Sequence, residues 1–77
     1  MKYQNIEVEK VKDSESGKTS VFEIMSSLGY KVIGHVYWNR IYRGYSFFPI
    51  SFSFFAPDVL CDIAKFLEDL KNGKAFP

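Results

Sequence analysis

Alternating hydrophobic and polar residues near the start of the chain predict a β-strand followed by a tight turn. Residues 6–9 are Ile-Glu-Val-Glu, so every second side chain falls on one face, as in a strand with one buried side. Residues 12–18 collect Lys, Ser and Asp together with Gly17, a composition typical of a turn. We therefore expect the chain to reverse direction after the first strand.

The next segment, residues 19–28, fits two kinds of secondary structure. Its apolar residues Val21, Ile24 and Leu28 follow helical spacing, which would allow a short helix. The same segment fits the return strand of a hairpin over residues 19–25. We favour the hairpin, because an isolated helix of about two turns gains little from its own hydrogen bonds.

Two longer alternating stretches predict further strands. The first covers residues 30–38 and the second is a long arm over residues 41–55, with Asn39 and Arg40 as the turn between them. Pro49 lacks the N–H group that a central strand donates, so it marks an edge, a bulge or a bend in the second arm. One face of that arm is a row of large apolar side chains: Phe48, Ile50, Phe52 and Phe54.

The C-terminal part of the chain predicts an amphipathic helix that begins at Pro57 and ends near Gly73. Proline suits the first helical position, and glycine suits a position just after the last one. One apolar stripe runs along this helix and consists of Leu60, Ile63, Leu67 and Leu70, with Val59 and Phe66 beside it. The opposite face carries Asp62, Lys65, Glu68, Asp69 and Lys71.

A helix with a single apolar face needs a sheet to cover, and we expect the apolar row of residues 48–54 to lie beneath it. The predicted fold class is α+β, a small antiparallel β-meander of about three to four strands packed on one C-terminal amphipathic helix. We expect one small domain over residues 1–77.

The composition adds a high content of aromatic residues to this pattern. The 77 residues include eight Phe, five Tyr and one Trp, and most of these rings lie between residues 30 and 55. Residues 24–57 also carry Lys31, Arg40 and Arg43 but no acidic residue, although the net charge of the whole chain is only +1. Since disordered chains are poor in aromatic residues, we expect a folded protein whose middle third is aromatic and mildly cationic.

The chain lacks the residues that several kinds of function require. The single cysteine, Cys61, excludes an internal disulfide, and with one histidine, His35, the chain has too few ligands for a structural zinc site. Residues 16–19 lack the first glycine of a phosphate-binding loop, because Lys12 stands in its place. We expect no enzyme activity, no cofactor and no metal. No segment has the apolar length of a signal peptide or a membrane span, so the expected location is the cytoplasm.

The run Arg43-Gly44-Tyr45-Ser46-Phe47-Phe48 resembles the first ribonucleoprotein signature of RNA-recognition motifs. In that family alternate aromatic side chains stack on bases, so the resemblance implies that Tyr45 and Phe47 stack and that Arg43 contacts phosphate. However, the first predicted strand lacks the aromatic residue of the companion signature, and Pro49 interrupts the strand that carries this one. We therefore do not assign the chain to the family.

Side chains alternate along a strand, so the row that begins at Phe48 cannot share a face with Tyr45 and Phe47. If the first set lies under the helix, the second set emerges on the far side of the sheet, together with Tyr37 and Trp38. A large exposed apolar surface on so small a protein usually marks an interface.

We therefore expect a non-catalytic protein-interaction module that self-associates as a dimer through this surface or binds a larger protein with it. In size and composition the chain is similar to small accessory proteins of phages and other mobile elements, which often act by binding a larger protein. The alternative is single-stranded nucleic-acid binding, which ranks second because three cations support only weak, shallowly salt-dependent affinity. Both hypotheses use the same surface: Lys31, Tyr37, Trp38, Arg40, Arg43, Tyr45 and Phe47.

Overall fold

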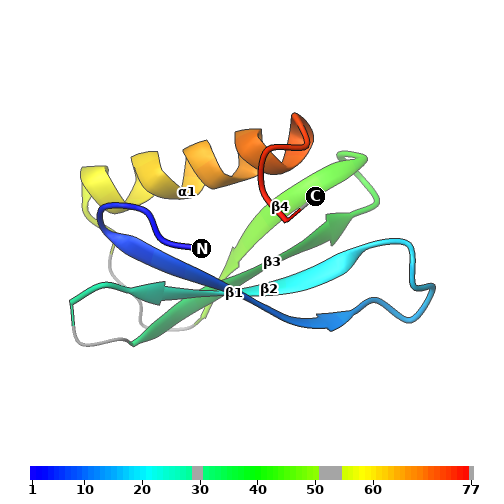
Figure 1. Ribbon diagram of the computed structural model, residues 1–77, viewed down its shortest axis with the longest axis horizontal. Coiled ribbons are helices and arrows are strands. Elements are labelled where there is room, and N and C mark those ends of the chain that lie inside the picture. Colours follow the sequence, from blue (N-terminus) through cyan, green and yellow to red (C-terminus); the bar gives the residue numbers. More distant parts are fainter. Residues whose placement is uncertain (29–30, 51–54, 77) are drawn as a thin grey trace.

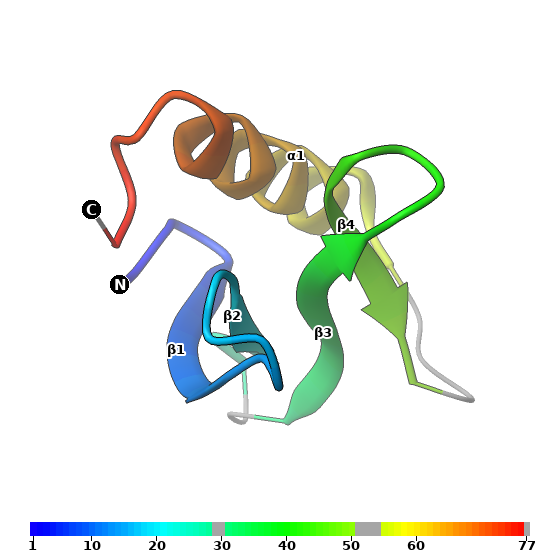
Figure 2. The same cartoon turned by 90° about the vertical axis from the view of Figure 1, so that its right-hand side faces the viewer.

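The computed structural model describes residues 1–28, 31–50 and 55–76, and within them it shows one antiparallel sheet and one helix (Figure 1). The strands are β1 (Ile6–Asp13), β2 (Ser20–Ser26), β3 (Val32–Asn39) and β4 (Gly44–Pro49), and the helix is α1 (Pro57–Lys71). Each strand pairs with the next, which gives the order β1-β2-β3-β4, and α1 covers one face of the sheet (Figure 2). The predicted α+β meander with a C-terminal helix is confirmed.

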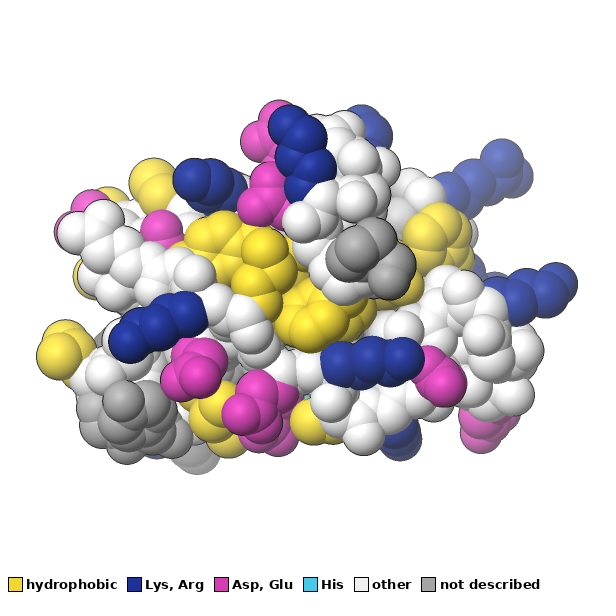
Figure 3. Space-filling model, in the orientation of Figure 1, with side chains coloured by type: hydrophobic (Ala, Val, Ile, Leu, Met, Phe, Trp, Pro, Cys, Tyr) yellow, Lys and Arg dark blue, Asp and Glu magenta, His cyan; other side chains and the backbone are white. Residues whose placement is uncertain are grey.

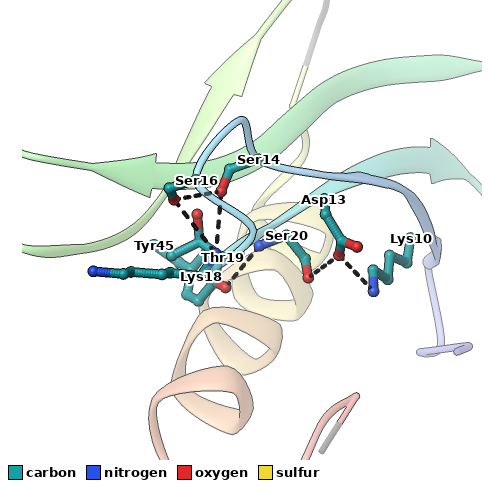
Figure 4. A network of polar contacts seen from close by, with 8 residues as sticks. All are labelled: Lys10, Asp13, Ser14, Ser16, Lys18, Thr19, Ser20 and Tyr45. Carbon is teal, nitrogen blue, oxygen red and sulfur yellow. Dashed lines mark hydrogen bonds and ion pairs between the residues drawn. The ribbon is translucent and has the colours of Figure 1, made fainter.

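The β1–β2 hairpin confirms that residues 20–26 form a strand rather than a helix. Its turn includes Gly17, whose φ of 72° lies in the left-handed region that glycine adopts at little cost. Polar contacts tie the turn together, since Thr19 donates its N–H to Ser14 Oγ (3.3 Å) and Lys10 pairs with Asp13 at 2.8 Å (Figure 4). The hydrogen bond and the charge of Lys10 lower the pKa of the Asp13 carboxyl.

The connection between β3 and β4 differs from the predicted two-residue turn at Asn39 and Arg40. Residues 40–43 all belong to the turn, and β4 runs only from Gly44 to Pro49. The N–H of Ile41 donates to Asn39 Oδ1 (2.9 Å), which bends the chain directly after β3. The predicted arm over residues 41–55 therefore starts too early and extends too far, and residues 51–54 lie outside the described residues.

The face of β4 beneath α1 is the reverse of the expected one. Phe47 lies opposite Val36, which is fully buried in the core, and Tyr45 also packs against that core. Phe48 lies on the other face, where its ring stacks on Tyr37 with centroids 3.8 Å apart. The prediction that the side chains of Tyr45 and Phe47 emerge on the far side of the sheet is therefore wrong. The strand register decides the face, because cross-strand partners share it.

The core joins the inner face of the sheet to α1, and its centre is an edge-to-face pair of Phe22 and Phe66 with ring centroids 5.4 Å apart. The predicted helix stripe is correct except at Leu60, which is 49% exposed. The buried hydrophobic residues are Ile6, Val8, Phe22, Ile24, Ile33, Val36, Ile63, Phe66 and Ala75.

Two acidic residues of α1 contact the N-terminal segment instead of lying on a purely solvated face. Asp62 Oδ2 accepts the backbone N–H of Asn5, and Asp69 Oδ2 accepts the hydroxyl of Tyr3, both at 2.6 Å. The prediction that both carboxylates lie on the solvated face of the helix is corrected accordingly. They hold residues 1–5 against the helix.

Candidate functional site

A groove opens where the β3–β4 turn meets the C-terminal half of α1. Figure 1 shows these two elements near each other at the upper right. It encloses about 640 Å³. We call it the hairpin–helix groove, and its lining residues are Trp38, Tyr42, Arg43, Gly44, Tyr45, Leu67, Glu68, Leu70 and Lys71.

The aromatic wall of the groove is held in place from behind. Trp38 meets Tyr45 edge-on, with centroids 5.6 Å apart and planes at 87°. Tyr45 in turn packs edge-on against buried Phe22 at 5.8 Å. Its hydroxyl accepts the backbone N–H of Ser20 at 3.2 Å, a contact that links the wall to the β1–β2 turn (Figure 4). Because the core and β2 both fix Tyr45, the wall is preorganised for binding.

The turn beside the groove presents two large apolar side chains to solvent. Ile41 is 87% exposed and Tyr42 is 79% exposed. Arg43 closes the turn with a φ of 51°, in the left-handed region that a residue with a Cβ adopts only at some cost. These features concentrate exposed apolar surface and backbone strain in one turn, next to the groove.

The charged side chains of the groove are two cations, Arg43 and Lys71, and one acid, Glu68. The ion pairs within the described residues are Lys10–Asp13 and His35–Glu23, so none of the three groove charges is engaged in one there. Lys71 also lies in the last turn of α1, where the helix dipole favours a cation. The groove therefore offers uncommitted positive charge to a ligand.

The structure brings three of the seven predicted surface residues together in the groove, namely Trp38, Arg43 and Tyr45. Arg40 lies in the adjoining turn and is exposed. Lys31 is also exposed, but it precedes β3 and so lies at the other end of that strand from the turn. Lys31 is therefore separated from the other cationic residues of the predicted surface by the length of β3.

The other two predicted residues lie elsewhere. Tyr37 is on the far face of the sheet in its stack with Phe48. Phe47 is on the helix side, where it packs edge-on against Phe55 at 5.5 Å. A continuous surface of all seven residues is therefore not present, because β3 and β4 send neighbouring side chains to opposite faces.

The helix contributes groove residues that sequence reasoning missed: Leu67, Glu68, Leu70 and Lys71. The apolar stripe assigned Leu67 and Leu70 to the core, and both are only partly buried. Tyr42 was also missed, because it was placed in a strand rather than a turn. For Tyr42 the sequence signal was the unusual Arg-Ile-Tyr-Arg composition of residues 40–43, whereas the helix residues gave no such signal.

A second apolar area lies beneath α1 on the side of the N-terminal segment, and Figure 3 shows basic and acidic side chains around it. Phe76 contributes to the packing at the C-terminal tail, since its ring centroid is 5.1 Å from that of Phe22 and 6.2 Å from that of Phe66. The N-terminal and C-terminal segments thus cover the part of the core that α1 leaves open.

Other polar side chains do not assemble into a site. His35 Nε2 lies 3.6 Å from Glu23 Oε2 on the far face of the sheet, and Cys61 is exposed on α1. Among the described residues, no three His, Cys, Asp or Glu side chains come together as metal ligands would. The same part of the chain contains no helix with the length and apolar content needed to cross a membrane.

Comparisons of the chain with protein-family models, curated proteins and solved structures find no match.

Proposed function

We propose that the protein is a non-catalytic protein-interaction module that binds a partner protein in the hairpin–helix groove. The observation that supports this most directly is the exposure of Ile41 (87%) and Tyr42 (79%) beside a groove of about 640 Å³. Exposed apolar side chains next to a hollow lined by Trp, Tyr and Arg are typical of protein-binding surfaces.

The chemistry of the groove favours a partner segment that carries an aromatic or aliphatic side chain next to an acidic one. The apolar group would pack between Trp38 on the hairpin and Leu70 on the helix. The acidic group would face Arg43, whose guanidinium can bind a carboxylate through two parallel hydrogen bonds, and Lys71. Glu68 disfavours a ligand that is acidic along its whole length.

Trp38 makes this proposal testable without a label, because it is the only tryptophan of the chain and it lines the groove. Peptides selected from a random displayed library on the immobilised full chain would be synthesised and titrated while the Trp38 fluorescence is followed. We expect the selected peptides to pair an apolar anchor with an acidic residue and to change the fluorescence on binding.

Two groove variants and one matched control make the titration specific. Tyr42→Ala should weaken binding by about tenfold or more if the ring is an anchor. Arg43→Gly removes the cation while glycine accepts the φ of 51°, so this variant should fold normally and lose salt-dependent affinity. Leu28→Ala alters an 89% exposed apolar residue at the other end of β3, and its binding should stay within about twofold of wild type. Equal binding by all three variants would show that the groove is not the binding site for the peptides.

Single-stranded nucleic acid is the second candidate ligand for this surface. The supporting observation is that Arg43 and Lys71 meet in the groove next to the exposed ring of Tyr42. Stacking on such a ring combined with phosphate contacts is how many single-strand binders work. A labelled oligothymidine titrated at low and at moderate salt separates the candidates. Oligothymidine binding that weakens with salt and is lost in Arg43→Gly, with no peptide binding by the same surface, would favour nucleic acid over a protein partner.

A further inference from the structure

The two edge strands of the sheet, β1 and β4, lie on opposite sides in Figure 2 and differ in how their outer backbone groups are covered. The N-terminal segment covers the start of the β1 edge, since the Met1 amino group donates to the Val8 carbonyl and the Val8 N–H donates back to the Met1 carbonyl, both at 2.8 Å. The ladder is also irregular between Lys10 and Lys12. Covering segments, lysines and bulges are the devices by which proteins prevent edge strands from pairing with other chains.

Among the described residues, the β4 edge shows no covering segment, lysine or bulge, and Pro49 at its end is its one such device. The N–H of Ile50 donates to the carbonyl of Ile33 (3.1 Å). With the register of β3 and β4, this bond shows which opposed pairs of the ladder are hydrogen-bonded and which are not. Residues 44, 46 and 48 therefore bond to β3, while the N–H and C=O groups of Tyr45 and Phe47 point away from the sheet. Within the described residues, no backbone hydrogen bond outside the ladder involves either of them.

The two edge strands also differ in charge, and this difference too favours pairing through β4 rather than β1. Residues 6–13 of β1 include Glu7, Glu9, Lys10 and Lys12, whereas β4 carries no charged residue from Gly44 to Pro49. When two identical strands pair about a two-fold axis, residues near the axis face their own copies, so charges there repel. Two uncharged β4 strands can pair without this charge repulsion, whereas two β1 strands would bring like charges together.

We propose that two copies of the chain pair through β4, antiparallel about a two-fold axis at Ser46, so that two four-stranded sheets become one. Tyr45 of one copy then lies opposite Phe47 of the other, and each such pair exchanges two backbone hydrogen bonds. Ser46 is the only small side chain in the middle of β4 and allows the close approach that the axis requires. Pro49 has no N–H group, and its ring nitrogen lies on the outer side of the ladder, so β3 loses no bond and the hydrogen bonds between the two copies are confined to the part of β4 before Pro49.

The side chains that flank this edge provide apolar surface for the contact. On the helix side Tyr45 and Phe47 are only partly buried, and on the far side Tyr37 is 39% exposed in its stack with Phe48. Pairing two β4 strands covers the aromatic side chains on both faces of the sheet at once. The contact uses the backbone edge rather than the hairpin–helix groove, so it does not depend on the function proposed for the groove.

A disulfide placed on the axis tests this arrangement. In the full chain with Cys61→Ser, Ser46→Cys puts two cysteines at a non-hydrogen-bonded pair, where Cα atoms about 4.5 Å apart suit a disulfide. Under mild oxidation we expect the Ser46→Cys chain to become a covalent dimer. The control is Lys12→Cys on the β1 edge in the same background, which is exposed and should remain monomeric. Cross-linking of Ser46→Cys that is no faster than that of Lys12→Cys would overturn the proposal.

Charge provides a second test that needs no cross-link. Ser46→Lys places two ammonium groups at the axis, whereas Ser46→Thr keeps a small uncharged side chain suited to a strand. Circular dichroism would first establish that both variants are folded. In sedimentation equilibrium, wild type and Ser46→Thr should dimerise, and the dissociation constant of Ser46→Lys should rise by about tenfold or more. A monomeric wild type, or equal constants for all three proteins, contradicts pairing through β4.

Discussion

Gly34 shows how a single residue selects which side chains enter the core. A Cβ atom at this position would lie 2.6 Å from ring carbons of Phe47 and 2.6 Å from the carbonyl oxygen of Phe48. The absence of a side chain therefore gives Phe47 room on the helix side of β3. Glycine inside a strand often marks such a close approach.

We predict that Gly34→Ala destabilises the protein by about 1–3 kcal/mol, because the added methyl group meets backbone as well as a ring. Urea unfolding followed by circular dichroism measures the effect. Gly44→Ala is the matched control, since the nearest atom to its Cβ would be 3.9 Å away, and its unfolding free energy should change by about 0.5 kcal/mol or less. Similar losses in both variants would show that close packing at Gly34 is not the cause.

At the scale of elements, the contact between the N-terminal segment and α1 depends on two carboxylates. Tyr3 donates its hydroxyl to Asp69 at 2.6 Å and packs edge-on against Phe66 with centroids 6.1 Å apart. Burial, followed by the hydrogen bond to Asp69 and the charges of Asp69 and Asp62, raises the pKa of Tyr3 above its ordinary value of 10.0. Tyr3 thus links the first residues of the chain to its last helix.

This contact predicts a pH-dependent stability at alkaline pH. Unfolded chains ionise Tyr3 near its ordinary pKa of 10.0, whereas the folded chain retains the proton to higher pH. The stabilisation is therefore complete below that value and is lost as the pH rises beyond it. Near neutral pH, Tyr3→Phe should lower the unfolding free energy by about 1 kcal/mol.

The measurement compares urea unfolding of wild type and Tyr3→Phe from neutral pH to well above 10.0. The difference between the two proteins should shrink as the pH rises, because only wild type carries the ionising hydroxyl at this position. A difference that stays constant over the whole range would refute the role assigned to the Tyr3–Asp69 hydrogen bond.

At the scale of the whole molecule, the chain of 77 residues has a small core and one cysteine, so no internal disulfide supports it. Domains of this size bury a smaller fraction of their surface than larger ones, and association with another chain is one way to compensate. The backbone groups of Tyr45 and Phe47, which have no partner outside the ladder within the described residues, and the partly exposed rings of Trp38 and Tyr37 fit that requirement.

We predict that the midpoint of thermal unfolding rises with protein concentration, since association that involves only the folded chain stabilises it. Calorimetry over a wide concentration range measures this shift. The midpoint of Ser46→Lys, whose association is weakened, should depend less on concentration than that of wild type over the same range. If the wild-type midpoint is also independent of concentration, the folded chain is monomeric and the small core is sufficient by itself.

The secondary structure was largely predictable because it follows from local patterns. Alternation identified β1 and β3, and the apolar stripe with Pro57 and Gly73 identified α1. The β3–β4 turn was predicted at Asn39 and Arg40, but its full extent over residues 40–43 was not, because it depends on an unusual φ at Arg43 that composition does not reveal.

The candidate site was predictable only in part, for a related reason. Aromatic and cationic composition pointed to Trp38, Arg43 and Tyr45, which do line one groove. Leu67 and Lys71 come from the other end of the sequence, and they reach the groove only because α1 packs across the sheet beside the β3–β4 turn. Long-range packing of this kind leaves no local pattern in the sequence.

The sequence by itself thus determined the fold class, the strands around residues 6–9 and 30–38 and the C-terminal helix, because hydrophobic periodicity and turn residues act over a few neighbouring positions. The tertiary structure decided which face of β4 lies under α1, which sheet edge stays open and where the groove forms. Those features depend on strand register and on contacts such as Gly34 with Phe47 and Tyr3 with Asp69, which join residues far apart in the chain. A change of register by one residue would exchange the two faces of β4 while leaving its composition the same.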